Sequence, residues 1–332
     1  MTSQGGSRAS RRSPHGATAF LQDAVAGLRS TPKRISPKYF YDSAGSLLFD
    51  AICDLPEYYV TRTELSILEA KAGEIAASLA AGGPCRVVEP GAGSGTKTRL
   101  LLRALGPERC MAYVPVDIAG DHLEQMAAQL RDENPWLRVL PIAADFSQGL
   151  PLPEADARPA HTVVYFPGST IGNFDPDEAR RLLVRFREAV GPKGHVLLGV
   201  DLKKDPAKLH AAYNDSEGVT AAFNKNVLRR MNVELGADFD LDAFHHYAFY
   251  APVPGRIEMH LVSARRQVVH LGGHAFTFED GESICTEHSH KYDLATAERL
   301  GRSAGLSLAD SWLDAGRRFA ILLFHAASDP AG

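Results

Sequence analysis

Short apolar runs alternate with longer amphipathic segments through the middle of the chain. The runs predict strands over residues 85–89, 112–116, 137–143, 162–166 and 195–200. The amphipathic segments predict helices over residues 97–105, 121–133 and 176–190, the last with Asp175 as a possible cap. Strands that alternate with helices at this spacing form a parallel, doubly wound sheet, so we expect an α/β fold.

The pattern differs on either side of this block. Before it, helical periodicity covers residues 17–28, and a long helix is expected over 64–80; after it, residues 206–235 are expected to form helices. Alternating positions then predict antiparallel strands over residues 244–252, 256–264, 267–271 and 275–278. A helix at 295–304 and two strands at 307–313 and 319–325 end the chain. We therefore expect an α+β block inserted before the last strands of the sheet.

A glycine-rich turn follows the first strand of the alternating block. Glu89 precedes Gly91, Gly93 and Gly95, and a helix begins near Lys97. Glycine lets the backbone approach a ligand closely, and a helix N-terminus offers unpaired N–H groups. A plain tight loop is the alternative for such a turn in isolation. The spacing is neither that of a dinucleotide motif nor that of a P-loop. It resembles the nucleoside-binding turn of S-adenosylmethionine-dependent methyltransferases.

Polar residues follow the carboxyl ends of the other predicted strands, where doubly wound sheets bind ligands. They are Asp117, Asp145, Asn173 and Asp201. Asp117 could accept hydrogen bonds from ribose hydroxyls or cap a helix, and we favour the ligand role. Asp145 and Phe146 could present a carboxylate and a ring to an adenine, or serve as a cap and a core aromatic; both readings stay open.

Composition narrows the function classes. The 332 residues are 45% hydrophobic with a formal charge of -4, which argues against a nucleic-acid-binding protein. The four cysteines are scattered, so we expect a reducing cytoplasm and no disulfide or zinc framework. No apolar run reaches the length of a membrane span. Residues 1–16 are rich in Ser, Gly and Arg, which predicts a disordered tail.

The thirteen histidines call for a metal check. His245 and His246 are adjacent, and His288 and His290 could share one face of a strand. No acidic or cysteine complement stands at standard ligand spacing, so we expect no metal site. The residues alone also favour a packing role at a domain edge for Tyr41, Tyr58 and Tyr59.

Seven motifs in order resemble one known family, the L-histidine Nα-methyltransferases of ergothioneine biosynthesis, and the likeness covers nearly everything after Ala17. The motifs are residues 38–42 (KYFYD), 55–64 (LPEYYVTRTE), 168–173 (GSTIGN), 213–224 (YNDSEGVTAAFN), 238–244 (DFDLDAF), 256–259 (RIEM) and 286–291 (TEHSHK).

The resemblance implies an enzyme that trimethylates the α-amino group of free L-histidine to hercynine, with S-adenosyl-L-methionine as the consumed donor and no metal. It implies a Rossmann-like class I methyltransferase sheet, parallel and closed by a C-terminal hairpin, with an additional α+β substrate domain. We expect the substrate domain at residues 17–65 plus 206–287, and the donor-binding domain at 66–205 plus 288–330. The expected partners are histidine and its mono- and dimethyl intermediates, without nucleic acid or membrane, and the expected state is a monomer.

The resemblance also assigns site residues. The donor would meet Tyr41, Gly91, Gly93, Lys97, Asp117, Asp145 and Phe146. The histidine substrate would meet Tyr58, Gly168, Asn173, Tyr213, Met259, Glu287 and Ser289. In the family the asparagine and the second tyrosine hold the amino-acid end, and the glutamate and serine hold the imidazole.

These roles agree with the chemistry. Methyl transfer from a sulfonium is an in-line displacement that depends on positioning, and the attacking amine must be neutral. A neutral Asn173 does not favour the ammonium as a carboxylate would. Glu287 can accept from an imidazole N–H, which selects histidine over phenylalanine-like competitors. The sequence identifies no general base.

Two departures from the family pattern stand out. The turn has Pro90-Gly91-Ala92-Gly93 where Leu-Gly-Ser-Gly is familiar, and the glycines remain. His288 and His290 give the last motif unusual polarity, which could alter the imidazole pocket or its pH dependence.

Three alternatives compete with the histidine enzyme. An Nα-methyltransferase for another aromatic amino acid should lack Glu287 or Ser289. A non-catalytic module that binds S-adenosylmethionine should have lost acceptor groups, yet all are present. A nucleic-acid amino-methyltransferase should carry an Asp/Asn-Pro-Pro-aromatic motif where residues 166–169 read FPGS.

Overall fold

The computed structural model describes residues 14–118, 120–153 and 159–326. The chain forms two compact units, which are described separately. The smaller unit comprises residues 1–40, 221–247 and 259–287, and the larger unit comprises residues 41–220, 248–258 and 288–332. Residues 1–13, most of the expected tail, lie outside the described part of the chain.

The larger unit contains a sheet in which seven strands follow one path and an eighth joins at the side. Its order is β13 (Leu306–Leu313), β14 (Phe319–Ala326), β7 (His195–Asp201), β6 (His161–Phe166), β2 (Cys85–Pro90), β3 (Cys110–Asp117) and β4 (Arg138–Val139), with β5 (Ile142–Ala143) paired to β3. Strands β7, β6, β2, β3 and β4 run parallel, and the β13–β14 hairpin adds antiparallel to β7. The predicted α/β class and the closing hairpin are confirmed.

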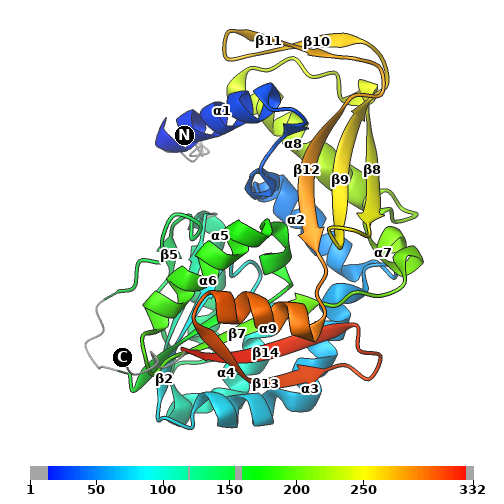
Figure 1. Ribbon diagram of the computed structural model, residues 1–332. Helices are drawn as coiled ribbons and strands as arrows, with labels where there is room; N and C mark the ends of the chain where they lie inside the picture. Colours follow the sequence, from blue (N-terminus) through cyan, green and yellow to red (C-terminus); the bar gives the residue numbers. More distant parts are fainter. Residues whose placement is uncertain (1–13, 119, 154–158, 327–332) are drawn as a thin grey trace, which may run out of the picture. The chain divides into compact units, whose positions relative to one another are not determined.

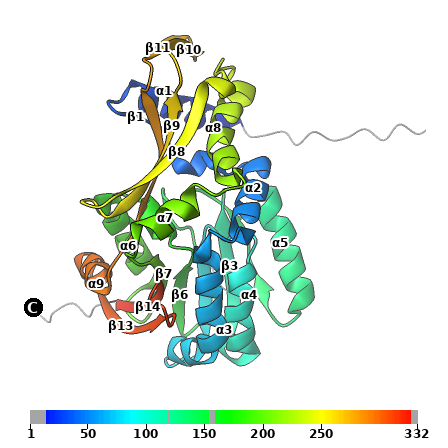
Figure 2. The same cartoon turned by 90° about the vertical axis from the view of Figure 1, so that its right-hand side faces the viewer.

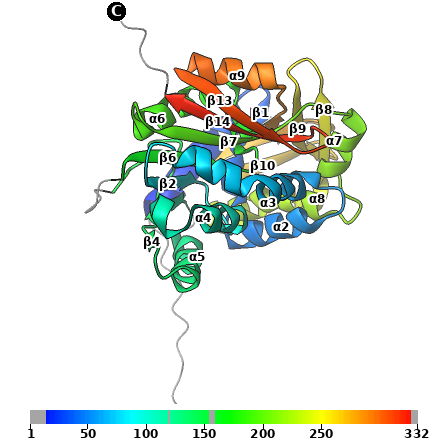
Figure 3. The same ribbon diagram turned by 90° about the horizontal axis from the view of Figure 1, so that it is seen from below.

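Helices cover both faces of this sheet, as Figures 2 and 3 show. On one face lie α3 (Tyr59–Leu79), α4 (Thr96–Arg109) and α5 (Gly120–Glu133), and on the other lie α6 (Pro176–Val190) and α9 (Leu294–Ser303). Every residue of β6 and β7 is buried, because a parallel sheet covered on both faces has no solvent side. This explains why these strands read as continuous apolar runs.

Three short elements complete the larger unit. They are α2 (Ser43–Asp54), η2 (Thr170–Asn173) and α7 (Pro206–Tyr213). The η2 turn follows β6 directly, so it lies at the carboxyl edge of the sheet, where such folds bind ligands.

The smaller unit is built from helices, a sheet and a hairpin. Helices α1 (Pro14–Arg29) and α8 (Val219–Leu235), with turns η1 (Pro37–Phe40) and η3 (Leu241–Ala243), accompany a sheet of order β1 (Lys33–Arg34), β12 (Ser283–His290), β9 (Arg256–Ser263) and β8 (Phe244–Ala251). Strands β10 (Gln267–Leu271) and β11 (His274–Phe278) form a separate hairpin (Figure 1). Strands β8, β9 and β12 continue into residues of the larger unit.

Aromatic packing forms the core of the smaller unit. The rings of Phe239, Phe244 and Phe278 lie 5.3–6.3 Å apart in edge-on pairs. Edge-to-face pairs of this kind stabilise a core beyond the area they bury. The inserted α+β block predicted from the alternating pattern is therefore a packed unit of its own.

Among the element boundaries that differ from the sequence prediction, three have a clear physical reason. Helix α3 begins at Tyr59 rather than residue 64, because Tyr59 and Val60 are buried in its first turn. The strand expected over residues 137–143 is two short strands, β4 and β5, since Pro141 between them cannot donate to a ladder. Helix α1 begins at Pro14, a residue type suited to a first helical turn.

The division into units also differs from the expected domains. Residues 41–65, 206–220 and 248–258 fall in the larger unit rather than with the α+β block. Within that unit, Tyr59 donates a hydrogen bond to Asp201, and Glu64 accepts one from Gly168. The assignment of donor and substrate binding to separate domains stays a prediction. None of the helices that the structure describes is long and apolar enough to cross a membrane.

Candidate active site

The glycine turn lies between β2 and α4 in the larger unit. Gly91, Gly93 and Gly95 all have positive φ, at 70°, 52° and 68°, which residues other than glycine rarely adopt. The backbone N–H of Gly93 donates to Asp117 Oδ2 at 3.3 Å. The turn and the end of β3 therefore meet at the carboxyl edge of the sheet, as predicted.

The other expected donor residues belong to the same unit. A Cβ built on Gly91 would lie 3.4 Å from the Phe146 ring, so glycine allows the close approach of that ring. Asp145 accepts from the backbone N–H and the hydroxyl of Ser147 at 2.9 and 2.5 Å. The Tyr41 ring lies 5.6 Å from the Phe49 ring. Phe146 thus lies against the glycine turn, whereas the donor roles of Asp145 and Tyr41 rest on the motifs.

Glu89 is a buried carboxyl group beneath the glycine turn. It accepts hydrogen bonds from Thr98 Oγ1 and Tyr113 OH, each at 2.5 Å. Burial raises its pKa to about 7, and the hydroxyls of Thr98 and Tyr113 counteract only part of that rise. Glu89 therefore ties the end of β2 to the first turn of α4 and to β3, which positions the turn.

Glu64 connects the two groups of expected site residues. Its side chain is fully buried and pairs with Lys97 Nζ at 2.7 Å. Its carboxylate also accepts from the backbone N–H of Gly168 at 2.9 Å. Gly199 leaves the room for this carboxylate, because a Cβ there would lie 2.4 Å from Glu64 Oε1. One carboxylate thus holds an expected donor residue, Lys97, beside an expected acceptor residue, Gly168.

We expect Glu64→Gln to lower kcat/KM for methyl transfer about tenfold to a hundredfold, because charge-assisted hydrogen bonds contribute about 1.5–3 kcal/mol. The neutral amide loses the ion pair with Lys97, and its NH2 group cannot accept from Gly168 N–H as Oε1 of the carboxylate does. Steady-state kinetics with each substrate varied in turn would measure the loss. Glu64→Asp keeps the charge and is expected to recover part of the activity; a Gln variant with unchanged constants for both substrates would contradict this role.

Three of the expected acceptor residues of the larger unit, Tyr58, Tyr213 and Ser289, lie together. The Tyr58 and Tyr213 rings meet edge-on at 6.4 Å. Tyr213 OH donates to Ser289 Oγ at 2.8 Å. Lys291 Nζ donates to Tyr213 OH at 3.0 Å and to Ser289 Oγ at 2.9 Å. Three residues assigned to the acceptor side by motif therefore lie together, with Lys291 beneath them.

A buried carboxylate anchors Lys291. Asp201 Oδ2 lies 3.0 Å from Lys291 Nζ, and both side chains are essentially inaccessible to solvent. Tyr59 OH donates to Asp201 at 2.8 Å, and Lys204 pairs with the same carboxylate. Burial lowers the pKa of Lys204 to about 8, although Asp201 opposes this shift. Asp201 thus neutralises two buried cations beside the acceptor group.

Two expected acceptor residues belong to the smaller unit. Met259 lies on β9 and Glu287 on β12, and both are buried. Thr286 Oγ1 donates to the Met259 carbonyl at 3.1 Å and to Asn224 Oδ1 at 2.7 Å, which holds these strands together. The roles of Met259 and Glu287 toward the imidazole stay predictions.

Asn173 ends the η2 turn in the larger unit. The preceding Gly172 allows the turn to approach β12, because a Cβ there would lie 2.7 Å from the His290 carbonyl oxygen. The backbone geometry therefore brings Asn173 next to the strand that carries Ser289.

Comparison with known proteins decides the family. The histidine-specific, S-adenosylmethionine-dependent methyltransferase family matches residues 20–326. The chain belongs to this family. The histidine-specific methyltransferases are enzymes that use S-adenosylmethionine, so the predicted enzyme class and methyl donor are confirmed.

Three relatives of this histidine-specific methyltransferase are informative. A histidine N-alpha-methyltransferase of Mycolicibacterium smegmatis is 40% identical over 92% of this chain and 95% of the relative. One from Mycobacterium tuberculosis is 39% identical, over 93% and 95%. A 4-dimethylallyltryptophan N-methyltransferase of Epichloe festucae var. lolii is 28% identical, over 88% and 90%.

Sequence reasoning did not assign four buried residues that support the site. They are Glu64, Glu89, Asp201 and Lys291. Glu64 and Lys291 stand inside the motifs at 55–64 and 286–291, and Glu89 and Asp201 end strands. The signal available in the sequence was therefore a polar residue at the end of an apolar run. It does not identify the partner of that residue, because the partner lies far away in the sequence.

Proposed function

We propose that this histidine-specific methyltransferase trimethylates the α-amino group of L-histidine to hercynine, through mono- and dimethyl intermediates, in ergothioneine biosynthesis. The observation that carries this proposal is the 40% identity, over 92% of this chain, to a protein named histidine N-alpha-methyltransferase. The acceptor-side residues expected from the motifs, Tyr58, Asn173, Tyr213, Glu287 and Ser289, are all present.

The donor is proposed to bind at the glycine turn. Gly91 and Gly93 let the backbone approach the donor closely, and Asp117 at the end of β3 is proposed to accept from the ribose hydroxyls. Asp145 and Phe146 come after β5 and are proposed to contact the adenine. Lys97, Tyr41 and the α4 N-terminus complete the donor contacts.

The acceptor is proposed to bind beside Tyr213 and Ser289. Asn173 and Tyr213 are proposed to hold the amino-acid end, with Tyr58 and Gly168 as further contacts. By motif, Glu287, Ser289 and Met259 are assigned to the imidazole. A neutral amide at Asn173 leaves the amine free to lose its proton, as nucleophilic attack on the sulfonium requires. Positioning of the amine in line with the methyl group then supplies much of the rate.

The direct test is incubation of the enzyme with S-adenosylmethionine and each of the twenty amino acids, followed by mass spectrometry. Histidine is expected to yield the trimethyl product with three equivalents of S-adenosylhomocysteine. Conversion of tyrosine or tryptophan with unmodified histidine would overturn the proposed acceptor but leave the methyltransferase chemistry intact.

One relative supports a second candidate acceptor. The Epichloe protein is named for a tryptophan derivative and aligns over 88% of this chain, so an indole amino acid is the alternative. A buried carboxylate favours an imidazole over an indole as the bound ring. The N–H of an indole lies farther from the amino-acid end of the molecule, so an indole would leave the buried carboxylate unpaired. Glu287 is such a carboxylate.

We expect Glu287→Ala to weaken histidine binding about tenfold to a hundredfold, since a hydrogen bond to a charged group contributes about 1.5–3 kcal/mol. Donor affinity should stay unchanged. Calorimetry of histidine and of S-adenosylhomocysteine would measure both. Glu279→Ala is the matched control, because Glu279 pairs with Arg266 on the surface of the same unit; equal losses for the two ligands would contradict the pocket assignment.

We also propose that the enzyme acts as a monomer in the cytoplasm. Its four cysteines are all free thiols, which suits a reducing compartment. Light scattering of the purified protein would test the monomer, and a mass of twice 35.9 kDa would contradict it.

A further inference from the structure

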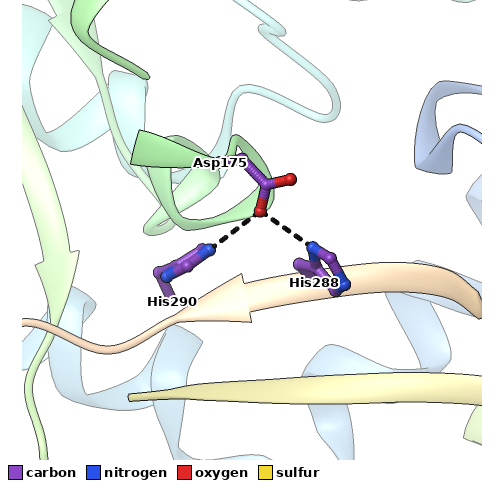
Figure 4. A group of neighbouring side chains, drawn as sticks. All are labelled: Asp175, His288 and His290. Atoms are coloured by element: carbon purple, nitrogen blue, oxygen red, sulfur yellow. Dashed lines mark hydrogen bonds and ion pairs between the residues drawn. The ribbon is translucent and has the colours of Figure 1, made fainter. Parts of the chain in front are cut away.

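Asp175, His288 and His290 converge at one point of the larger unit (Figure 4). Asp175 Oδ1 lies 2.9 Å from His288 Nδ1 and 3.2 Å from His290 Nε2. One ligand-type atom from each residue lies within 4.8 Å of the other two. This cluster, which we call the Asp–His–His cluster, has the atoms of a three-ligand metal site.

The cluster joins two elements that are far apart in the sequence. The histidines project from the end of β12, two positions apart on one face, as the alternation of a strand requires. Asp175 is the N-cap of α6, and Glu178 accepts from its backbone N–H at 3.2 Å. In the sequence, the spacing of His288 and His290 identifies two ligands but no third. The fold supplies the third, Asp175, which precedes His288 by 113 residues.

The backbone around the Asp–His–His cluster is held firmly. Gly172 packs directly on the His290 backbone, three residues before Asp175, and no larger residue would fit. The capped first turn of α6 fixes the position of Asp175. The three ligand residues are therefore preorganised, which reduces the entropy lost when they bind an ion.

The atoms that face one another also suit a cation. His288 directs Nδ1 and His290 directs Nε2 toward the Asp175 carboxylate, and both ring nitrogens and carboxylate oxygens are metal-ligand atoms. Each imidazole can bind through the nitrogen that faces Asp175 when its proton lies on the other ring nitrogen.

Arg256 opposes a cation at this point. Its guanidinium donates to Asp175 Oδ1 at 3.1 Å. It also pairs with Glu258 at 2.8 Å, so it keeps a carboxylate partner if an ion displaces it from Asp175. Displacing Arg256 from Asp175 costs free energy, so Arg256 lowers the affinity of the cluster for an ion without preventing binding.

We propose that the Asp–His–His cluster binds one divalent transition-metal ion of the zinc class. Two imidazole nitrogens, one carboxylate oxygen and a water are the ligand set that zinc accepts in open, four-coordinate sites. The ion replaces the hydrogen bonds that the two histidines now donate to Asp175. Ser289 stands between the two histidines, so a bound ion fixes the strand that carries it. An effect on methyl transfer rests on the proposed function, whereas the metal site does not.

The test is calorimetric titration of the tag-free, chelator-treated enzyme with ZnSO₄, without substrate, supported by elemental analysis. One equivalent is expected to bind to the cluster. His288→Ala, His290→Ala and Asp175→Asn are each expected to weaken binding at least tenfold. Arg256→Gln is expected to tighten it about tenfold, because it removes a competing cation.

His325→Ala is the matched control. In the larger unit, the Nδ1 atoms of His325 and His195 lie 2.7 Å apart. The variant therefore disrupts another pair of histidines but removes no ligand of the cluster. The control should bind one equivalent with unchanged affinity. Co²⁺ in place of Zn²⁺ should show the intense visible absorption of a four-coordinate ion, a readout of the unmutated enzyme.

Three outcomes would overturn the proposal. They are the absence of stoichiometric binding to the unmutated enzyme, undiminished binding in the His288 and Asp175 variants, and weakened binding in Arg256→Gln. If the buried His290 variant does not fold, the partly exposed His288 variant and the Co²⁺ spectrum still decide the question.

Discussion

Replacing Asp201 with asparagine is expected to lower the free energy of unfolding by about 3–5 kcal/mol, the usual loss when one partner of a buried ion pair is removed. The Asp201 and Lys291 side chains are 0% and 1% exposed, with Nζ and Oδ2 3.0 Å apart. Lys204 pairs with the same carboxylate and is 9% exposed. The amide would leave two buried ammonium groups without a counter-charge. Little solvent can reach them to compensate.

Urea denaturation followed by circular dichroism would measure the loss. Glu298→Gln is the matched control, because Glu298 pairs with Arg302 on the surface and should lose less than about 1 kcal/mol. The double variant Asp201→Asn/Lys291→Met should lose less than the sum of the two single variants, since it removes one stranded charge. Additive losses would show that Asp201 and Lys291 do not act as a pair.

We expect Glu89→Gln to abolish a loss of about 3 kcal/mol in the free energy of unfolding that the parent protein suffers as the pH rises. Burial is the main cause that raises the pKa of Glu89 in the folded state from its ordinary value of 4.5 to about 7. The folded state therefore binds the proton more tightly than the unfolded state does. Stability conferred by this group is greatest below about pH 4.5 and falls as the pH rises toward about 7. Glutamine does not titrate, so the Gln variant does not lose stability in this way as the pH rises.

The measurement is urea denaturation of both proteins at pH 5 and pH 8. The Gln variant should gain stability relative to the parent between these pH values, and groups that titrate alike in both proteins cancel in the comparison. Glu74→Gln is the control, because Glu74 is an exposed partner of Lys71 and should give a small pH-dependent difference. A stability difference between Glu89→Gln and the parent that does not change with pH would contradict the assigned pKa.

The two carboxylates differ in a way that matters for the enzyme. Asp201 holds Lys291 beneath Tyr213 and Ser289, on the proposed acceptor side. Glu89 lies under the glycine turn, on the proposed donor side. Glu64 links the two sides through Lys97 and Gly168. Three buried carboxyl groups of the larger unit thus lie on the proposed donor and acceptor sides.

The order of strands and helices followed from local patterns. A parallel strand covered on both faces must be apolar throughout, so β6 and β7 were visible as runs. The predictions were least accurate where tertiary contacts override local preference. Buried Tyr59 extends α3 toward the N-terminus, and Pro141 separates β4 from β5.

By itself the sequence determined the fold class, the glycine turn and, through its motifs, the family. These are local features, because a turn needs glycine where φ is positive and a motif is read along the chain. Only the tertiary structure decided which charges neutralise one another. Glu64 meets Gly168 across 104 residues, and Asp175 meets His288 across 113. Such pairs leave no periodic signal, since one partner can stand on any element that the fold brings near.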